Sequence, residues 1–116
     1  MARRIIFRVH ALRRMFERNI TVEDVALVVR IAELIGGQPD IVREPEFHTL
    51  LGRASEVIEN YPDDNPYPSR LLLGWCQERP LHVVVAENAQ DDEWIIITAY
   101  EPDPAQWDAD FKRRKP

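Results

Sequence analysis

The sequence contains few of the residues and runs that mark whole classes of proteins. It has one cysteine, Cys76, which cannot form an internal disulfide and fits a reducing compartment. No apolar run approaches the roughly 20 residues that span a bilayer, and the start of the chain lacks the long apolar stretch of a secretory signal. These absences predict a cytoplasmic protein without a membrane partner.

Glycine and metal-ligand patterns are also scarce. The four glycines form no Gly-rich phosphate loop, and no serine lies in a nucleophile elbow. The histidines and the cysteine are too scattered to suggest a zinc site, at His10, His48, Cys76 and His82. We therefore expect neither a metal nor a cofactor.

Charge is segregated along the 116 residues. The net charge is −5, yet residues 1–18 hold six arginines against one glutamate, and residues 112–115 are four cations. Residues 19–111 hold five arginines against nineteen acids. Two basic ends on an acidic body form a local patch if the fold brings them together, and such a patch attracts nucleic acid.

The first third of the chain changes from a strand pattern to helical periodicity. Residues 4–9 form a short apolar run typical of a strand. Residues 10–19 place apolar side chains at helical spacing. A second helix is predicted to begin after Thr21, with Asp24 completing a capping box.

The second half is rich in strand signals. Short links join its apolar segments, which indicates an antiparallel meander. The predicted strands are residues 56–61, 70–76, 81–86 and 94–100. Asp103 is then expected to cap a short final helix with Pro104 at its first position, which would carry Trp107 and Phe111 onto the sheet.

These elements predict a single α+β domain over residues 1–116. Two N-terminal helices and a C-terminal helix are expected to pack on a mainly antiparallel sheet of four to five strands.

Four segments together resemble a bacterial family, domain of unknown function 4258. They read HALRRMFERNIT, EVIENYPDDNPYPSRLLLGW, RPLHVVVAE and IIITAYEPDPAQWDADFKRRK. The resemblance covers residues 5–30 and 54–115, and its order of elements is similar to that of RelE-like and BrnT-like ribonuclease toxins. It implies a RelE-like fold.

One segment departs from this family pattern. The pair Gly36-Gly37 is expected to end the second helix. Residues 31–53 are interpreted as a loop-like insertion relative to the family, with some local order.

The resemblance implies metal-independent RNA cleavage by Arg, Lys, Tyr and His side chains on the sheet and the last helix. Such cleavage needs a proton acceptor, a proton donor and positive charge on the phosphate. The candidate catalytic residues are His10, Arg14 and Tyr100. The candidate phosphate-binding residues are Arg13, Arg18, Lys112, Arg113 and Arg114.

Each candidate also has a purely structural interpretation. His10 can cap its helix or bond a carbonyl, and Arg14 can belong to a solvated helix face. His82 lies in an apolar strand, which favours a hydrogen-bonded core histidine. Tyr100 can be a core aromatic whose hydroxyl has a partner.

Two functions therefore stay open. The first is a toxin-like metal-independent endoribonuclease, or a degenerate relative, with RNA and an antitoxin-like protein as partners. The second is a non-catalytic interaction or regulatory module that uses the sheet and residues 31–53, since the acidic middle of the chain repels RNA. A homodimer is compatible with both.

Overall fold

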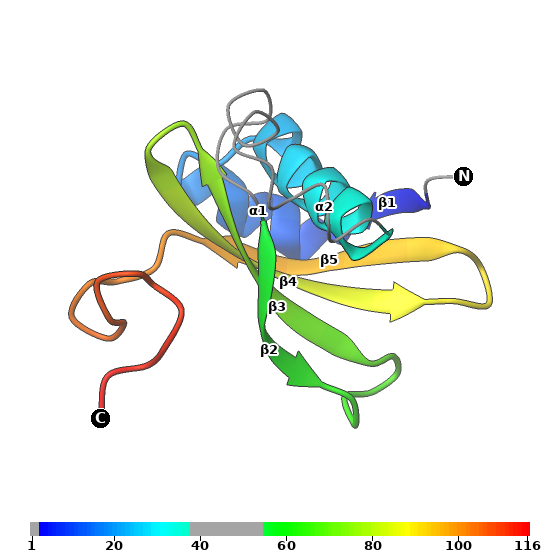
Figure 1. The fold of residues 1–116 in the computed structure, drawn as a ribbon. Helices are drawn as coiled ribbons and strands as arrows, with labels where there is room; N and C mark the ends of the chain where they lie inside the picture. Colours follow the sequence, from blue (N-terminus) through cyan, green and yellow to red (C-terminus); the bar gives the residue numbers. More distant parts are fainter. Residues whose placement is uncertain (1–2, 38–54) are drawn as a thin grey trace.

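The fold is a five-stranded sheet with two helices on one face, seen in a computed structural model that describes residues 3–37 and 55–116 (Figure 1). The α+β class and the mainly antiparallel sheet are confirmed. In chain order the elements are β1 (Arg4–Phe7), α1 (Val9–Glu17), α2 (Val22–Gly37), β2 (Glu56–Tyr61), β3 (Ser69–Cys76), β4 (Arg79–Asn88) and β5 (Glu93–Tyr100).

The strands lie in the order β1-β5-β4-β3-β2. Strands β2 to β5 form the predicted antiparallel meander. The short β1 adds to β5 in parallel and pairs only with Glu93 to Ile96. Within the described chain, residues 97–100 of β5 therefore have no strand beside them on that edge.

The main core lies between the sheet and the helices. Alternate residues of β4, namely Leu81, Val83 and Val85, face the helices, because side chains along a strand point to opposite faces. From α1 they meet Ala11 and Met15, which are almost fully buried. His82 points to the opposite face.

Both helices begin near their predicted residues. Val9, expected to end the first strand, instead begins α1. The capping box of α2 is confirmed: the Asp24 amide donates to Thr21 Oγ1 at 3.1 Å, and the Thr21 amide donates to Asp24 Oδ2 at 3.4 Å.

The helix α2 continues to Gly37, so residues 31–37 are helical and not the start of a loop. The prediction was wrong there because Ile31, only 4% exposed, extends the apolar face formed by Val28. Residues 38–53 of the expected insertion lie outside the described residues.

The predicted C-terminal helix does not form in the described residues 101–116. Asp103 caps a single turn, in which its carbonyl accepts the amides of Gln106 and Trp107. The chain then reverses, with a positive φ of 62° at Phe111 and an isolated bridge between Trp107 and Arg114. Anchoring of the two aromatic residues on the sheet outweighs the weak helix propensity of this Asp-rich segment.

Candidate active site

A row of basic side chains follows one face of α1. His10, Arg14 and Arg18 are four residues apart, so they are neighbours on the helix surface. All three are exposed. Within residues 3–37 and 55–116, the ion pair of Arg14 is a long contact of 3.5 Å with Glu17. Arg14 and Arg18 therefore present positive charge to solvent from the middle and the end of the helix.

Arg18 joins this row to the end of β5. Its Nη1 donates to the Ala99 carbonyl at 2.9 Å and lies 3.5 Å from Thr98 Oγ1, on the edge that β1 leaves open. Arg79 on β4 holds the turn after α1 by donating to the carbonyls of Arg18 and Asn19. The sequence places Arg18 on a helix, and only the fold brings it to this strand edge.

On the opposite sheet face, Tyr100 meets His82, its partner in the β4–β5 register. His82 is fully buried, and its Nε2 lies 2.8 Å from the Phe111 carbonyl. A carbonyl only accepts, so Nε2 carries the hydrogen. Burial lowers the pKa of His82, which keeps the ring neutral. Its Nδ1 is then an acceptor, and the Tyr100 hydroxyl, 3.3 Å away, donates to it.

Charged and aromatic side chains enclose this pair. Trp107 packs edge to face on the His82 ring at a centroid distance of 4.4 Å. The Arg114 guanidinium lies 4.7 Å from the Trp107 ring centroid and donates to both oxygens of Glu59, at 3.0 and 3.1 Å. These bonds lower the pKa of Glu59. Glu59 also accepts a hydrogen bond from Tyr61.

Tyr100 is less enclosed than His82. It is half-buried, and this burial raises the pKa of its phenol, so the hydroxyl is protonated at neutral pH. Arg114 and Arg18 both act on the Tyr100 phenol electrostatically. The cluster therefore has a proton donor, a neutral base behind it and positive charge at its rim.

The fold brings together some of the predicted site residues and separates others. Tyr100 contacts His82, Arg114 acts electrostatically on both, and Arg18 acts on the Tyr100 phenol from the edge of β5. His10 is eight residues before Arg18, about 12 Å along the helix, with Arg14 between them. The remaining predicted cations are exposed: Arg13 on α1, Lys112 in a 2.9 Å ion pair with Glu56, and Arg113.

Sequence reasoning did not select Glu59 and Tyr61 as site residues. They are alternate residues of β2 and therefore share a sheet face with His82. In the sequence, only their alternation with Asn60 indicated that they share a face of the strand. Any strand with one exposed face shows the same alternation, so it did not indicate a site. His82 was expected to be a hydrogen-bonded core residue, and its two partners confirm this.

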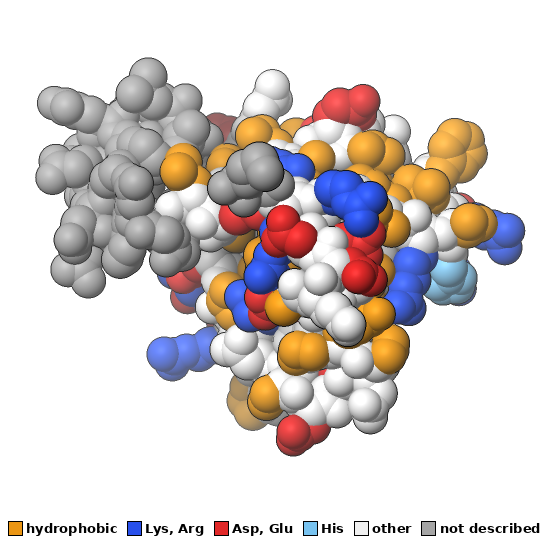
Figure 2. All heavy atoms as spheres, turned by 90° about the vertical axis from the view of Figure 1, so that its right-hand side faces the viewer, with side chains coloured by type: hydrophobic (Ala, Val, Ile, Leu, Met, Phe, Trp, Pro, Cys, Tyr) orange, Lys and Arg blue, Asp and Glu red, His pale blue; other side chains and the backbone are white. Residues whose placement is uncertain are grey.

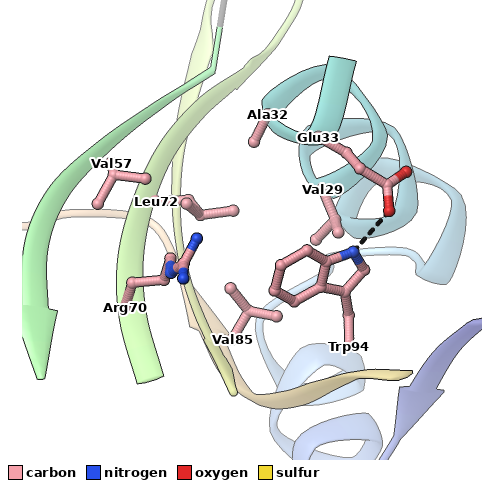
Figure 3. Close-up of a pocket in the computed structure, with 8 residues that line it drawn as sticks. All are labelled: Val29, Ala32, Glu33, Val57, Arg70, Leu72, Val85 and Trp94. Atoms are coloured by element: carbon pink, nitrogen blue, oxygen red, sulfur yellow. Dashed lines mark hydrogen bonds between the residues drawn. The ribbon is translucent and has the colours of Figure 1, made fainter. Parts of the chain in front are cut away.

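A pocket lies between α2 and the sheet, on the helix-covered face (Figure 3). It has a volume of about 190 Å³ and is lined mainly by apolar side chains. Its polar groups bind each other or nearby residues: the Trp94 indole donates to Glu33 at 2.7 Å, and Arg70 forms a 3.0 Å ion pair with Glu87. This arrangement is typical of packing and does not supply a poised acid or base.

Other kinds of site find little support in the described part of the chain. Its His, Cys, Asp and Glu side chains form no group that could hold a metal ion. The Cys76 thiol donates to Asp24 at 2.9 Å, which raises the thiol pKa and makes it a poor nucleophile. None of the helices in residues 3–37 and 55–116 is long and apolar enough to cross a membrane.

Comparison with known proteins identifies the chain only at the level of a family. No curated protein and no solved structure matches it. The model of one family, described as Domain of unknown function (DUF4258), matches residues 7–101, which include both helices and all of β2 to β5. The chain therefore belongs to the DUF4258 family.

Proposed function

We propose that this protein is a toxin-like, metal-independent endoribonuclease or a degenerate relative of one. The observation that carries the proposal is the chain of contacts from Tyr100 through His82 to the Phe111 carbonyl, beside Arg18 at the edge of β5. A carbonyl that fixes the tautomer of a histidine prepares its other nitrogen to receive a proton. The same orienting relationship underlies base-assisted nucleophiles in hydrolases.

In this mechanism the RNA backbone follows the basic row of α1 and turns around the edge of β5. The Tyr100 oxygen takes the proton of a 2′-hydroxyl as the Tyr100 proton moves to His82 Nδ1. The 2′-oxygen forms a bond to phosphorus, the bond to the 5′-oxygen breaks, and this oxygen takes a proton from water. Arg18 and Arg114 stabilise the charge on the phosphate, while Arg14 and His10 act along the same backbone.

Removal of the Tyr100 hydroxyl group tests this mechanism most directly. We expect Tyr100→Phe to lower the rate of RNA cleavage by about 10²–10⁴-fold, because it removes the proton path and little volume. The assay compares purified wild type, Tyr100→Phe, His10→Ala and Arg14→Ala on structured and single-stranded RNA. Tyr67→Phe, the same chemical change in the β2–β3 turn, is the matched control.

Equal RNA decay in wild type, Tyr100→Phe and a blank would reject the enzyme. A loss of activity in Tyr67→Phe equal to that in Tyr100→Phe would reject the assigned proton path. Retained activity in His10→Ala with loss in Tyr100→Phe would place the chemistry at the end of β5 and not at the start of α1.

The alternative function is an interaction or regulatory module built on the sheet and residues 31–53. A variant lacking residues 38–54 tests it by its mass in solution and its set of bound proteins. An unchanged mass and an unchanged partner set would show that this segment is not an interface.

A further inference from the structure

Arg79, the first residue of β4, connects two parts of the fold that meet beside Tyr100. Its Nη1 donates to the Asn19 carbonyl at 2.8 Å and its Nη2 to the Arg18 carbonyl at 2.9 Å. Its Nε donates to Oε2 of Glu101 at 3.0 Å. Glu101 directly follows Tyr100 in the chain, so one guanidinium joins the end of α1 to the end of β5.

The end of α1 has a need for such a donor. The last carbonyls of a helix have no amide partner within it, and a cation close to them is favoured by the helix dipole. Asn19 has a positive φ of 56°, the left-handed conformation in which helices commonly end. The planar fork of an arginine holds two carbonyls and a carboxylate at once, which the single ammonium group of a lysine does not reproduce.

Arg18 is consequently held at both of its ends. Its backbone carbonyl accepts a hydrogen bond from Arg79, and its guanidinium donates to the carbonyl of Ala99 at 2.9 Å. An unrestrained arginine side chain samples many rotamers, so a fixed backbone narrows the space that its guanidinium can reach. Here that space lies next to the residue that precedes Tyr100.

We propose that Arg79 is a positioning residue, which holds Arg18 against the end of β5. In the proposed nuclease, on which this consequence rests, Arg79 keeps the Arg18 guanidinium where the phosphate lies beside Tyr100. Arg79 itself is directed at protein groups and takes no part in the bonds that form and break. Arg18 acts electrostatically on the Tyr100 phenol, which agrees with such an arrangement.

The other members of the basic row do not depend on Arg79. His10 and Arg14 are exposed on α1, and Figure 2 shows Lys or Arg side chains beside a His side chain at the molecular surface. These groups remain available to the RNA backbone when Arg79 is replaced. We therefore expect the substitution to affect the rate of cleavage more than the binding of RNA.

A double-mutant cycle on RNA cleavage tests this role. Arg79→Lys keeps the charge and removes the fork, and it should lower kcat about 10–100-fold with KM within about twofold, because a misplaced catalytic group costs rate. In an Arg18→Met background the same change should alter kcat less than about twofold, since Arg79 acts through Arg18. Arg70→Lys is the control, at an arginine of similar exposure that pairs with Glu87 on the sheet. Circular dichroism confirms that each variant is folded.

An NMR measurement without RNA tests the positioning by itself. A guanidinium held by the Ala99 carbonyl should give a side-chain N–H signal that exchanges slowly with water, and Arg18→Met assigns this signal. Arg79→Lys should speed its exchange about fivefold or more, because the held conformation opens more often. Arg70→Lys should leave the exchange rate unchanged.

These two experiments separate the positioning from the nuclease. The proposal is overturned if the wild type gives no protected Arg18 signal, if Arg79→Lys leaves the protection intact, or if Arg79→Lys lowers kcat equally with and without Arg18. Loss of protection in Arg79→Lys supports the positioning even where the wild type cleaves no RNA, a result that would reject the nuclease alone.

Discussion

At the scale of the residue, His82 shows how burial selects one state of a titratable group. The ring has a hydrogen-bond partner at each nitrogen, and one of these, the Phe111 carbonyl, accepts in every protonation state. Protonation would require the Tyr100 hydroxyl to turn from donor to acceptor in a space closed by Trp107. Desolvation thus favours the neutral ring and lowers its pKa, while the bond to the Phe111 carbonyl acts in the opposite direction.

This state has a measurable consequence for pH dependence. Burial lowers the pKa of His82 below its ordinary value of 6.5, so the unfolded chain binds more protons than the folded one below about pH 6.5. The stability that His82 contributes is present above this pH and is lost as pH falls toward the folded pKa. We expect the ring signals of His82 in an NMR titration to move only below pH 6.5. A midpoint at or above 6.5 would contradict the buried neutral imidazole.

At the scale of the element, the contact between α2 and β3 depends on a missing side chain. A Cβ added at Gly74 would lie 2.5 Å from both γ-methyl groups of Val28, which is too close for any carbon pair. Valine is stiff at χ1 and has little freedom to move away. Gly74 therefore sets how closely the helix approaches the sheet.

We expect Gly74→Ala to lower the free energy of unfolding by about 1–3 kcal/mol through overpacking. Val28→Ala alone should also destabilise, because it leaves a cavity. The double variant should be more stable than the sum of the two losses implies, since the new methyl group fills the space that Val28 leaves. Urea unfolding of the three variants measures this coupling, and strictly additive losses would contradict the close approach.

In the C-terminal segment, tertiary contacts also decide the local structure. Asp103 and Pro104 were expected to start a short final helix, but only a single turn forms there. The chain leaves it after one turn because Trp107 and Phe111 reach the sheet only when the backbone reverses. Tertiary contacts of large aromatic side chains outweigh weak local propensity.

At the scale of the whole molecule, one arginine from each basic end acts electrostatically on the Tyr100 phenol. Arg18 approaches Tyr100 from the helix side and Arg114 from the C-terminal segment, and both act on its phenol. Their charges are not equally available, since Arg114 is held by Glu59 and Lys112 by Glu56. The free positive charge therefore lies mainly on α1.

This asymmetry predicts the salt dependence of RNA binding. Arg13→Gln and Arg14→Gln should each weaken binding and reduce the slope of log affinity against log salt by about 0.7–0.9, as expected for one lost phosphate contact. Arg113→Gln should have a smaller effect. Arg4→Gln, at an exposed arginine paired with Glu93, is the control and should change neither quantity. Slopes that do not differ among the four variants would argue against RNA on the basic row.

The sequence by itself determined most of the secondary elements and the class of fold. Periodicity and turn residues are local signals, and they sufficed for α1, for the Thr21 cap and for the four-strand meander. The resemblance to the family, and not these local signals, marked Tyr100 and Arg18 as candidates. The local signals placed the start of the loop-like segment too early, at residue 31. The helix α2 continues to the glycine pair at 36 and 37, because Ile31 extends its apolar face.

Only the tertiary structure decided which of these residues meet. The β4–β5 register places Tyr100 on His82, the short β1 opens the edge that Arg18 occupies, and the reversal after Trp107 brings the Phe111 carbonyl to the ring. Each depends on contacts between residues far apart in sequence, which local patterns do not encode. The same holds for the apolar residues of α1: Ala11 and Met15 are almost fully buried on the sheet, whereas Phe16, at the same helical spacing, is 87% exposed.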